Sequence, residues 1–289
     1  MKRPRRADAP RGARPPSRAA GGRGERRPSR PRHRAKTEEM FHGVRACEAI
    51  FARRPEDIVR VYVAESQRRR FAALTAWCAK ERRGFQIVPP ENLARIAGSL
   101  HHEGIAILAR AVRRHDMADL LRGLADGTIH GPLVYLDGVQ NPHNLGTILR
   151  TAAHFGAGAV IGRTGELPGL SAAAARVAEG AAEVVPVVEV ADAAADLRRL
   201  ATAGYAVVAT SSHRGESLHK RGLAPRSVIL LGSEGEGLSR GIEAVADRHV
   251  RIPGTGAVES LNVSVACGVL LAAATRPAGS VPGRAEAGR

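Results

Sequence analysis

The sequence predicts an α/β protein built around a mostly parallel sheet. Apolar runs typical of buried strands alternate with helical stretches along residues 131–276, the pattern of a sheet covered by helices. The first of these runs, "PLVYLDGV" at 132–139, is almost continuously apolar, as expected for a strand covered on both faces. A length of 289 residues with 44% hydrophobic residues leaves room for a second, smaller domain.

Residues 38–110 predict that smaller α/β domain. "IVRVYVAE" at 58–65 places apolar residues at strand period, whereas "GVRACEAIFARR" at 43–54 spaces them as a helix does. A second helix at 71–84, a strand at 85–88, a short helix at 91–98 and a strand at 104–112 follow. Residues 111–130 are expected to be a linker carrying the helix-like "HDMADLLRGLADG".

The larger domain, 131–276, continues in the same alternation after its first strand. We expect a loop that runs into a helix within 139–158, and further helices at 171–182, 191–204, 239–246 and 260–276. We expect strands at 158–163, 183–190, 205–210, 227–231 and 249–253.

Both ends of the chain are expected to be disordered. Residues 1–36 hold 14 Lys and Arg against two acids, so most of the net charge of +16 belongs to this tail. It is rich in proline and nearly free of large apolar residues, so residues 1–37 cannot form a core. A polycation of this kind favours nucleic acid as its partner. Residues 277–289 are small, polar and proline-containing.

The sequence supports neither a membrane or secreted protein nor one stabilised by disulfides or a metal. No apolar run of about 18 residues predicts a membrane span, and no signal peptide opens the chain. The three cysteines are far apart and form no CxxC pair, so neither a disulfide framework nor a metal site is indicated. These observations favour a cytoplasmic protein with reduced thiols.

Polar and glycine-rich stretches follow four predicted strands, at the edge of the sheet where ligands of α/β proteins bind. The loop "GSEGEGLS" at 232–239 lacks the Lys-Ser/Thr of a phosphate loop, and no strand is followed by GxGxxG. A nicotinamide-dependent enzyme is therefore disfavoured. Asn262 lies in the predicted first turn of the last helix, where it needs a partner, while Ser260 or Glu259 is expected to cap that helix. By residue type alone, Arg150 is more typical of a solvated cation with its stem on the surface. Its combination with the asparagine- and glycine-rich loops at the strand ends favours a site residue instead.

Three stretches resemble the SpoU (TrmH-like) family of RNA ribose 2′-O-methyltransferases, within the SPOUT superfamily. They are "NPHNLGTILRTAAHFG" at 141–156, "LGSEGEGLS" at 231–239 and "IPGTGAVESLNVSVACGVLLA" at 252–272. Residues 39–110 also resemble the small RNA-binding domain that precedes many SpoU catalytic domains. One departure is Gly254-Thr255 after Ile252-Pro253, where many members carry a methionine.

The resemblance implies a trefoil-knotted methyltransferase domain at 131–276 that works as a homodimer and binds S-adenosylmethionine, with no metal. The positions that match the family's functional polar residues are Asn144, Arg150, Glu234, Ser260 and Asn262. Those that match the loops around the cofactor are Thr210, Gly232, Ile252 and Leu261.

The implied activity is methylation of a ribose 2′-hydroxyl in structured RNA, with ribosomal RNA favoured over transfer RNA. The resemblance gives Arg150 the role of base or of a group that orients the hydroxyl and its phosphate. A guanidinium stays protonated at physiological pH, so a grip on phosphate is physically easier. The alternative is a non-catalytic RNA-binding protein that keeps the fold.

Deleting residues 1–36 is expected to weaken RNA binding, because the tail adds non-specific attraction to phosphates. The slope of log affinity against log salt concentration should become shallower in the truncated protein. An unchanged slope would show that the tail does not contact the RNA.

Overall fold

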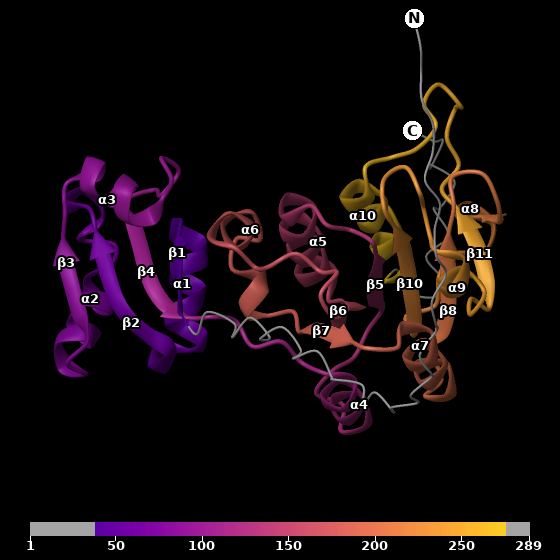
Figure 1. Cartoon of the computed structure of the whole chain (residues 1–289), viewed down its shortest axis with the longest axis horizontal. Helices are drawn as coiled ribbons and strands as arrows, with labels where there is room; N and C mark the ends of the chain where they lie inside the picture. Colours follow the sequence, from indigo (N-terminus) through magenta and orange to yellow (C-terminus); the bar gives the residue numbers. More distant parts are fainter. Residues whose placement is uncertain (1–37, 276–289) are drawn as a thin grey trace, which may run out of the picture. The chain divides into compact units, whose positions relative to one another are not determined.

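The computed structural model describes residues 38–275, and its larger sheet confirms the predicted parallel α/β class (Figure 1). Seven strands lie in the order β7-β6-β5-β10-β8-β11-β9, and every recorded pair of neighbours is parallel. Their bounds are Leu133–Asp137 (β5), Ala159–Arg163 (β6), Val187–Val190 (β7), Ala206–Thr210 (β8), Glu216–Ser217 (β9), Ser227–Gly232 (β10) and Arg248–Arg251 (β11).

Helices cover both faces of this sheet. Helices α5 (Pro142–Phe155) and α10 (Val263–Ala274) bury one face, and α4 (Met117–Ala125), α7 (Ala193–Thr202) and α9 (Arg240–Glu243) bury the other (Figure 1). Helix α6 (Ala172–Val177) packs against α5, and the short α8 (Leu218–Arg221) precedes β10. The alternating side chains of β5, β8 and β10 enter the two apolar cores in turn, as the pleat of a doubly covered strand requires.

The smaller sheet has four strands in the order β1-β4-β2-β3. Strands β1 (Glu38–His42) and β2 (Ile58–Val63) each pair antiparallel with β4 (Ile105–Arg110), and β3 (Gly84–Ile87) runs parallel to β2. Helices α1 (Val44–Arg53) and α2 (Ala72–Lys80) bury one face, and α3 (Pro90–Ala97) contributes to a separate cluster with Ala64 and Ala106. Two 3-10 turns, η1 (Pro55–Asp57) and η2 (Glu65–Gln67), flank β2.

Several elements differ from the prediction. The helix expected over 171–182 ends at Val177, because Glu179 and Gly180 adopt left-handed backbone angles with φ of 48° and 86°. A 3-10 turn, η3 (Ala181–Glu183), follows, and β7 begins only after Pro186, which has no N–H for a ladder. The polar segment "EEMFH" was not predicted as a strand, yet it forms β1 at the edge of the small sheet.

The stretch 111–130, expected as a linker, contains α4. Met117 and Leu120 of this helix are buried in the core beneath the large sheet. The side chain of Asp116 caps the helix by accepting a hydrogen bond from the backbone N–H of Asp119 at 2.8 Å. Within residues 38–275, no helix is long and apolar enough to cross a membrane.

The turn between α6 and β7 also contacts the first helix of the small sheet. A Cβ on Gly180 would lie 2.6 Å from the Cβ of Ala49, so the backbone approaches α1 closely there. Arg54, after α1, donates hydrogen bonds to both carboxylate oxygens of Glu183 at 2.6 and 2.8 Å. Burial by itself would lower the pKa of the Arg54 guanidinium. The Glu183 carboxylate has the larger effect, and the pKa is raised.

All three thiols are buried. Burial raises the pKa of Cys78 to about 11 and that of Cys267 to about 12, and it raises the pKa of Cys47 further. The cysteines therefore act as small apolar core residues, as the sequence predicts.

Replacing Leu120 by alanine should lower the free energy of unfolding by about 2–5 kcal/mol, since the fully buried side chain would leave a cavity. Urea denaturation measures this loss. Leu100 is 84% exposed, so the Leu100→Ala control should stay within about 0.5 kcal/mol of the parent. Equal losses in the two variants would contradict the placement of α4 in the core.

Candidate active site

Three polar side chains from three separate loops meet at the carboxyl edge of the large sheet. The amide nitrogen Nδ2 of Asn262 donates to Oε1 of Glu234 at 2.7 Å and to Oδ1 of Asn144 at 3.2 Å. The Asn144 amide nitrogen donates to the same Glu234 oxygen at 3.1 Å. The sequence predicted these residues as site residues from positions up to 118 apart, and the structure brings the three together. We refer to them as the amide–carboxylate trio.

Each member of the trio is fixed by the element that carries it. Asn144 lies in the first turn of α5, behind the cap residue Asn141, and its side chain is 7% exposed. Glu234 is exposed in a tight turn that two backbone hydrogen bonds between Ser233 and Gly237 close, at 3.2 and 3.1 Å. A buried amide and a rigid turn leave little freedom to the carboxylate between them.

Asn262 holds its place by capping α10. Its side-chain oxygen accepts from the backbone N–H of Ser264 at 2.9 Å and from the Ser264 hydroxyl at 2.6 Å. The expectation that Ser260 or Glu259 caps this helix is therefore wrong, because α10 begins one residue after Asn262. The asparagine is not in the helix interior, and at a cap it is among the preferred residues.

The trio borders a hollow of about 160 Å³. Besides Asn144 and Glu234, the residues that line it are Gly138, Val139, Gln140, Asn141, Ser233 and Val263. Most of these were not singled out from the sequence. Position alone indicated them: except for Val263, which begins α10, they lie in the segments that follow β5 and β10, which are neighbours in the sheet.

The residues expected around the cofactor lie at the ends of adjacent strands. The hydroxyl of Thr210, at the end of β8, donates to the carbonyl oxygen of Leu230 in β10 at 2.7 Å. At Gly232, the last residue of β10, a Cβ would lie 2.1 Å from the carbonyl carbon of Gly237. Only glycine fits this approach of two backbone segments. Ile252 is partly buried just beyond β11.

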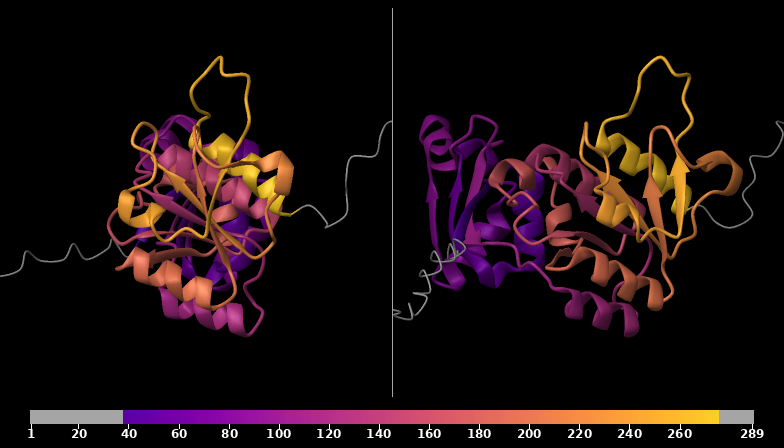
Figure 2. Two further views of the ribbon diagram at one scale, coloured as in Figure 1. Left: turned by 90° about the vertical axis from the view of Figure 1, so that its right-hand side faces the viewer. Right: turned by 45° about the vertical axis from the view of Figure 1, so that its right-hand side comes forward.

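Leu261 and Ser260 belong to the loop that joins β11 to α10. This loop, gold in Figure 2, extends beyond the ends of the strands and helices in all views. Both residues are exposed, Leu261 to 44%. On α10 the side chains of Val265 and Val269 are also exposed, to 52% and 37%, so with Leu261 they form an apolar stripe on the surface.

Arg150 does not join the trio within one chain. It follows Asn144 by six residues on α5, which turns its side chain by about 240° around the helix axis. Its Nη1 instead forms an ion pair with Oε1 of Glu179 at 3.0 Å, and its side chain is 56% exposed. Glu179 is one of few residues other than glycine with a positive φ, a conformation that costs energy and that places this carboxylate beside Arg150.

Among residues 38–275, no group of three or more His, Cys, Asp or Glu side chains is arranged to hold a metal ion. The polar groups of the trio are a carboxylate and two amides that already bond to one another. This arrangement suits a polar or cationic organic ligand beside the hollow.

Comparison with known protein families finds a match for each of the two domains. Residues 131–272 match the SpoU rRNA Methylase family, and residues 41–114 match a domain described as RNA 2′-O ribose methyltransferase substrate binding. The substrate-binding match covers the small sheet, and the methylase match covers the large one.

Curated relatives are a third or more identical to the chain over the aligned residues. A protein named "Uncharacterized tRNA/rRNA methyltransferase YfiF" from Escherichia coli is 37% identical over 240 residues, which are 83% of this chain and 68% of the relative. The 23S rRNA (guanosine-2′-O-)-methyltransferase RlmB of Ralstonia nicotianae is 40% identical over 210 residues, 71% of this chain and 83% of the relative.

Solved structures share the fold. The SpoU methyltransferase AviRb from Streptomyces viridochromogenes superposes with a TM-score of 0.66 at 20% identity, covering 83% of this chain and 89% of that one. An AdoMet-bound rRNA methyltransferase from Sinorhizobium meliloti superposes with a TM-score of 0.64 at 24% identity, covering 81% and 85%. From the two matched domains and the extent of identity, the chain belongs to the SpoU rRNA methylase family.

Proposed function

We propose that this protein transfers a methyl group from S-adenosylmethionine to a ribose 2′-hydroxyl of structured RNA. The amide–carboxylate trio carries the proposal, because it joins residues of all three stretches that resemble the SpoU family. Ribosomal RNA is the favoured substrate, since the relative from Ralstonia nicotianae is named for 23S rRNA. Action on ribosomal RNA would place the protein in the cytoplasm.

The residues at the carboxyl edge fit the cofactor. The hollow beside Asn144 and Glu234 and the close backbone approach at Gly232 both lie at this edge, and a glycine there lets a ligand approach the main chain. Gly232, Thr210, Ile252 and Leu261 lie in the loops that would hold it. When bound, S-adenosylmethionine would supply an electrophilic methyl group carried on a positively charged sulfonium.

The chain's own residues position the groups that react. The Glu234 carboxylate, held by two amide N–H donors, would place negative charge on the side of the hollow where a cationic cofactor could bind. Arg150 grips the phosphate beside the target ribose through the N–H groups that Glu179 leaves free. The ribose proton leaves through Ser260, Asn262 or solvent, because a guanidinium is a poor base.

A second copy of the chain would complete this site. The stripe formed by Leu261, Val265 and Val269 exposes large apolar side chains at helical spacing, which is typical of a helix that packs against a partner. A homodimer buries this stripe and allows Arg150 of one copy to approach the trio of the other. We also infer the trefoil knot of the family; the late strand β10 lies between β5 and β8, which supports it.

Arg150→Ala should lower methyl transfer by about 100-fold or more while leaving S-adenosylmethionine binding unchanged, because the guanidinium acts on the RNA and not on the cofactor. Transfer of labelled methyl groups to RNA and isothermal titration measure the two quantities. Arg199→Ala is the matched control, since Arg199 is 53% exposed and pairs with Asp196 at 2.8 Å on a different helix.

An Arg150→Ala protein with full activity would overturn the assignment. A parent chain that binds RNA but neither binds the cofactor nor transfers methyl groups would instead support the non-catalytic alternative.

Gly232→Ala should weaken S-adenosylmethionine binding by about 10-fold or more, because the new Cβ has to push the Gly237 backbone out of place. Isothermal titration reports the change. Gly241→Ala is the control: a Cβ at position 241 meets no atom within 4 Å. If Gly232→Ala binds S-adenosylmethionine as tightly as the parent, this turn is not part of the cofactor pocket.

A further inference from the structure

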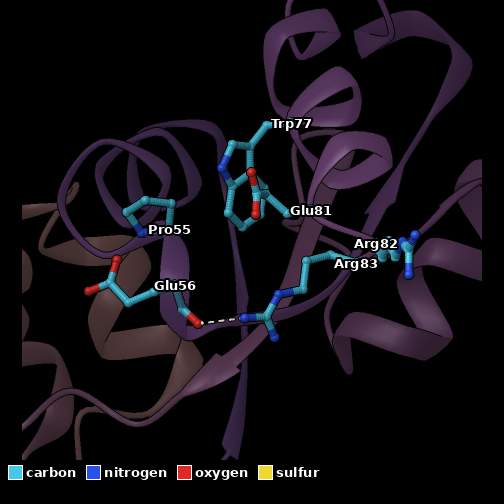
Figure 3. Close-up of a pocket in the computed structure, with 6 residues that line it drawn as sticks. All are labelled: Pro55, Glu56, Trp77, Glu81, Arg82 and Arg83. Atoms are coloured by element: carbon cyan, nitrogen blue, oxygen red, sulfur yellow. Dashed lines mark hydrogen bonds between the residues drawn. The ribbon is translucent and has the colours of Figure 1, made fainter.

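We propose that a hollow in the small-sheet domain binds one unpaired nucleobase of the RNA, stacked against Trp77. The inference rests on the proposed function and extends it to a second contact with the substrate, apart from the amide–carboxylate trio. The hollow has a volume of about 470 Å³ (Figure 3). It is lined by Pro55, Glu56, Trp77, Glu81, Arg82 and Arg83. All six lie in the part of the chain that matches the substrate-binding domain.

Trp77 is the only tryptophan of the chain, in which aromatic residues make up only 3%. One side of its indole packs edge-to-face on Phe51, with ring centroids 5.8 Å apart at 65°, so the core holds the ring in place. The side chain is nevertheless only partly buried, and it forms a wall of the hollow. A fixed, accessible indole is a stacking surface for a flat ring.

The loop opposite the tryptophan is also held in place. Nη2 of Arg83 donates to the backbone carbonyl oxygen of Glu56 at 3.1 Å, which ties the β3 side of the hollow to η1 (Figure 3). Pro55 adds a rigid apolar ring to the lining. The hollow therefore exists before any ligand enters, and its occupant need not order these side chains.

The charges select the kind of occupant. Glu56 and Glu81 bring carboxylates, which repel phosphate and accept hydrogen bonds from exocyclic amino groups. Such groups are present on adenine, guanine and cytosine but not on uracil. Arg82 is exposed, with a left-handed φ of 55°, and Figure 3 shows its side chain pointing away from Pro55. There it can bind the phosphate that follows an inserted base.

A cationic peptide is a weaker fit. An arginine or lysine side chain would meet the two carboxylates and the indole, but it would also face Arg82 and Arg83 at the same hollow. A nucleotide can contact both kinds of charged side chain in the hollow. The amino group of its base donates hydrogen bonds to the carboxylates, and its phosphate binds the arginine.

The single tryptophan makes occupancy directly measurable. Short oligoadenylate added to the full-length parent protein should quench the Trp77 fluorescence saturably, and oligouridylate of the same length should quench it less. Binding of both oligomers is followed in parallel by fluorescence anisotropy of an end label. RNA binding without any quenching would overturn the proposal, and so would quenching by a short arginine-rich peptide but not by RNA.

Variants test the same contact through the reaction. Trp77→Leu should raise KM for the RNA substrate by about 5- to 100-fold, the range that loss of one stacked base predicts, with kcat little changed. Trp77→Phe should recover part of the loss. Phe85→Leu is the matched control, because Phe85 is 39% exposed on β3 of the same sheet and does not line the hollow. Thermal unfolding checks that each variant folds.

The two proposals fail in different ways. If Trp77→Leu keeps the KM of the parent while Arg150→Ala is inactive, the nucleobase site is wrong and the methyl transfer stands. If the parent transfers no methyl group to RNA, the proposed reaction fails, and the fluorescence titration still decides whether RNA occupies the hollow.

Discussion

The parallel direction of the seven strands is the constraint on which the candidate active site depends. When neighbouring strands run the same way, each ends at the same edge of the sheet, and the chain has to cross back through a helix before it can add another strand. Loops far apart in sequence are thereby forced together at that edge. The amide–carboxylate trio is a direct result: its members follow β5, β10 and β11, and no two of them are closer than 28 residues in the chain.

The sheet was predictable from local signals, whereas the members of the trio were assigned from the resemblance to the SpoU family. Apolar runs marked the strands, and the polar residues after them marked the edge. The position of Asn262 in the helix was misjudged, because a predicted start at residue 260, three residues before the observed Val263, turns a favourable cap into a costly interior position. The ion pair between Arg150 and Glu179 could not be predicted from the sequence. It depends on the left-handed backbone at Glu179, and a glutamate does not indicate that conformation.

The turn at residues 178–183 connects the two sheets in a way that no pattern in the sequence indicated. Glu183 receives the Arg54 guanidinium from the small-sheet domain, and Glu179 pairs with Arg150 on α5. A buried, bidentate pair is costly to break, whereas an exposed single contact is worth little. The Glu183 contact thus anchors the turn, and the Glu179 contact leaves Arg150 free to exchange its carboxylate for a phosphate.

The burial of Cys47, Cys78 and Cys267 protects the folded protein from oxidation and alkylation of its thiols. Peroxides and alkylating agents attack thiolates, and the raised pKa values keep all three sulfurs protonated at neutral pH. Because the chain has no other cysteine, it presents no reactive thiol while it remains folded. Modification of these side chains by such reagents would therefore report opening of the small-sheet core, which holds Cys47 and Cys78, or of the core between the large sheet and α10, which holds Cys267.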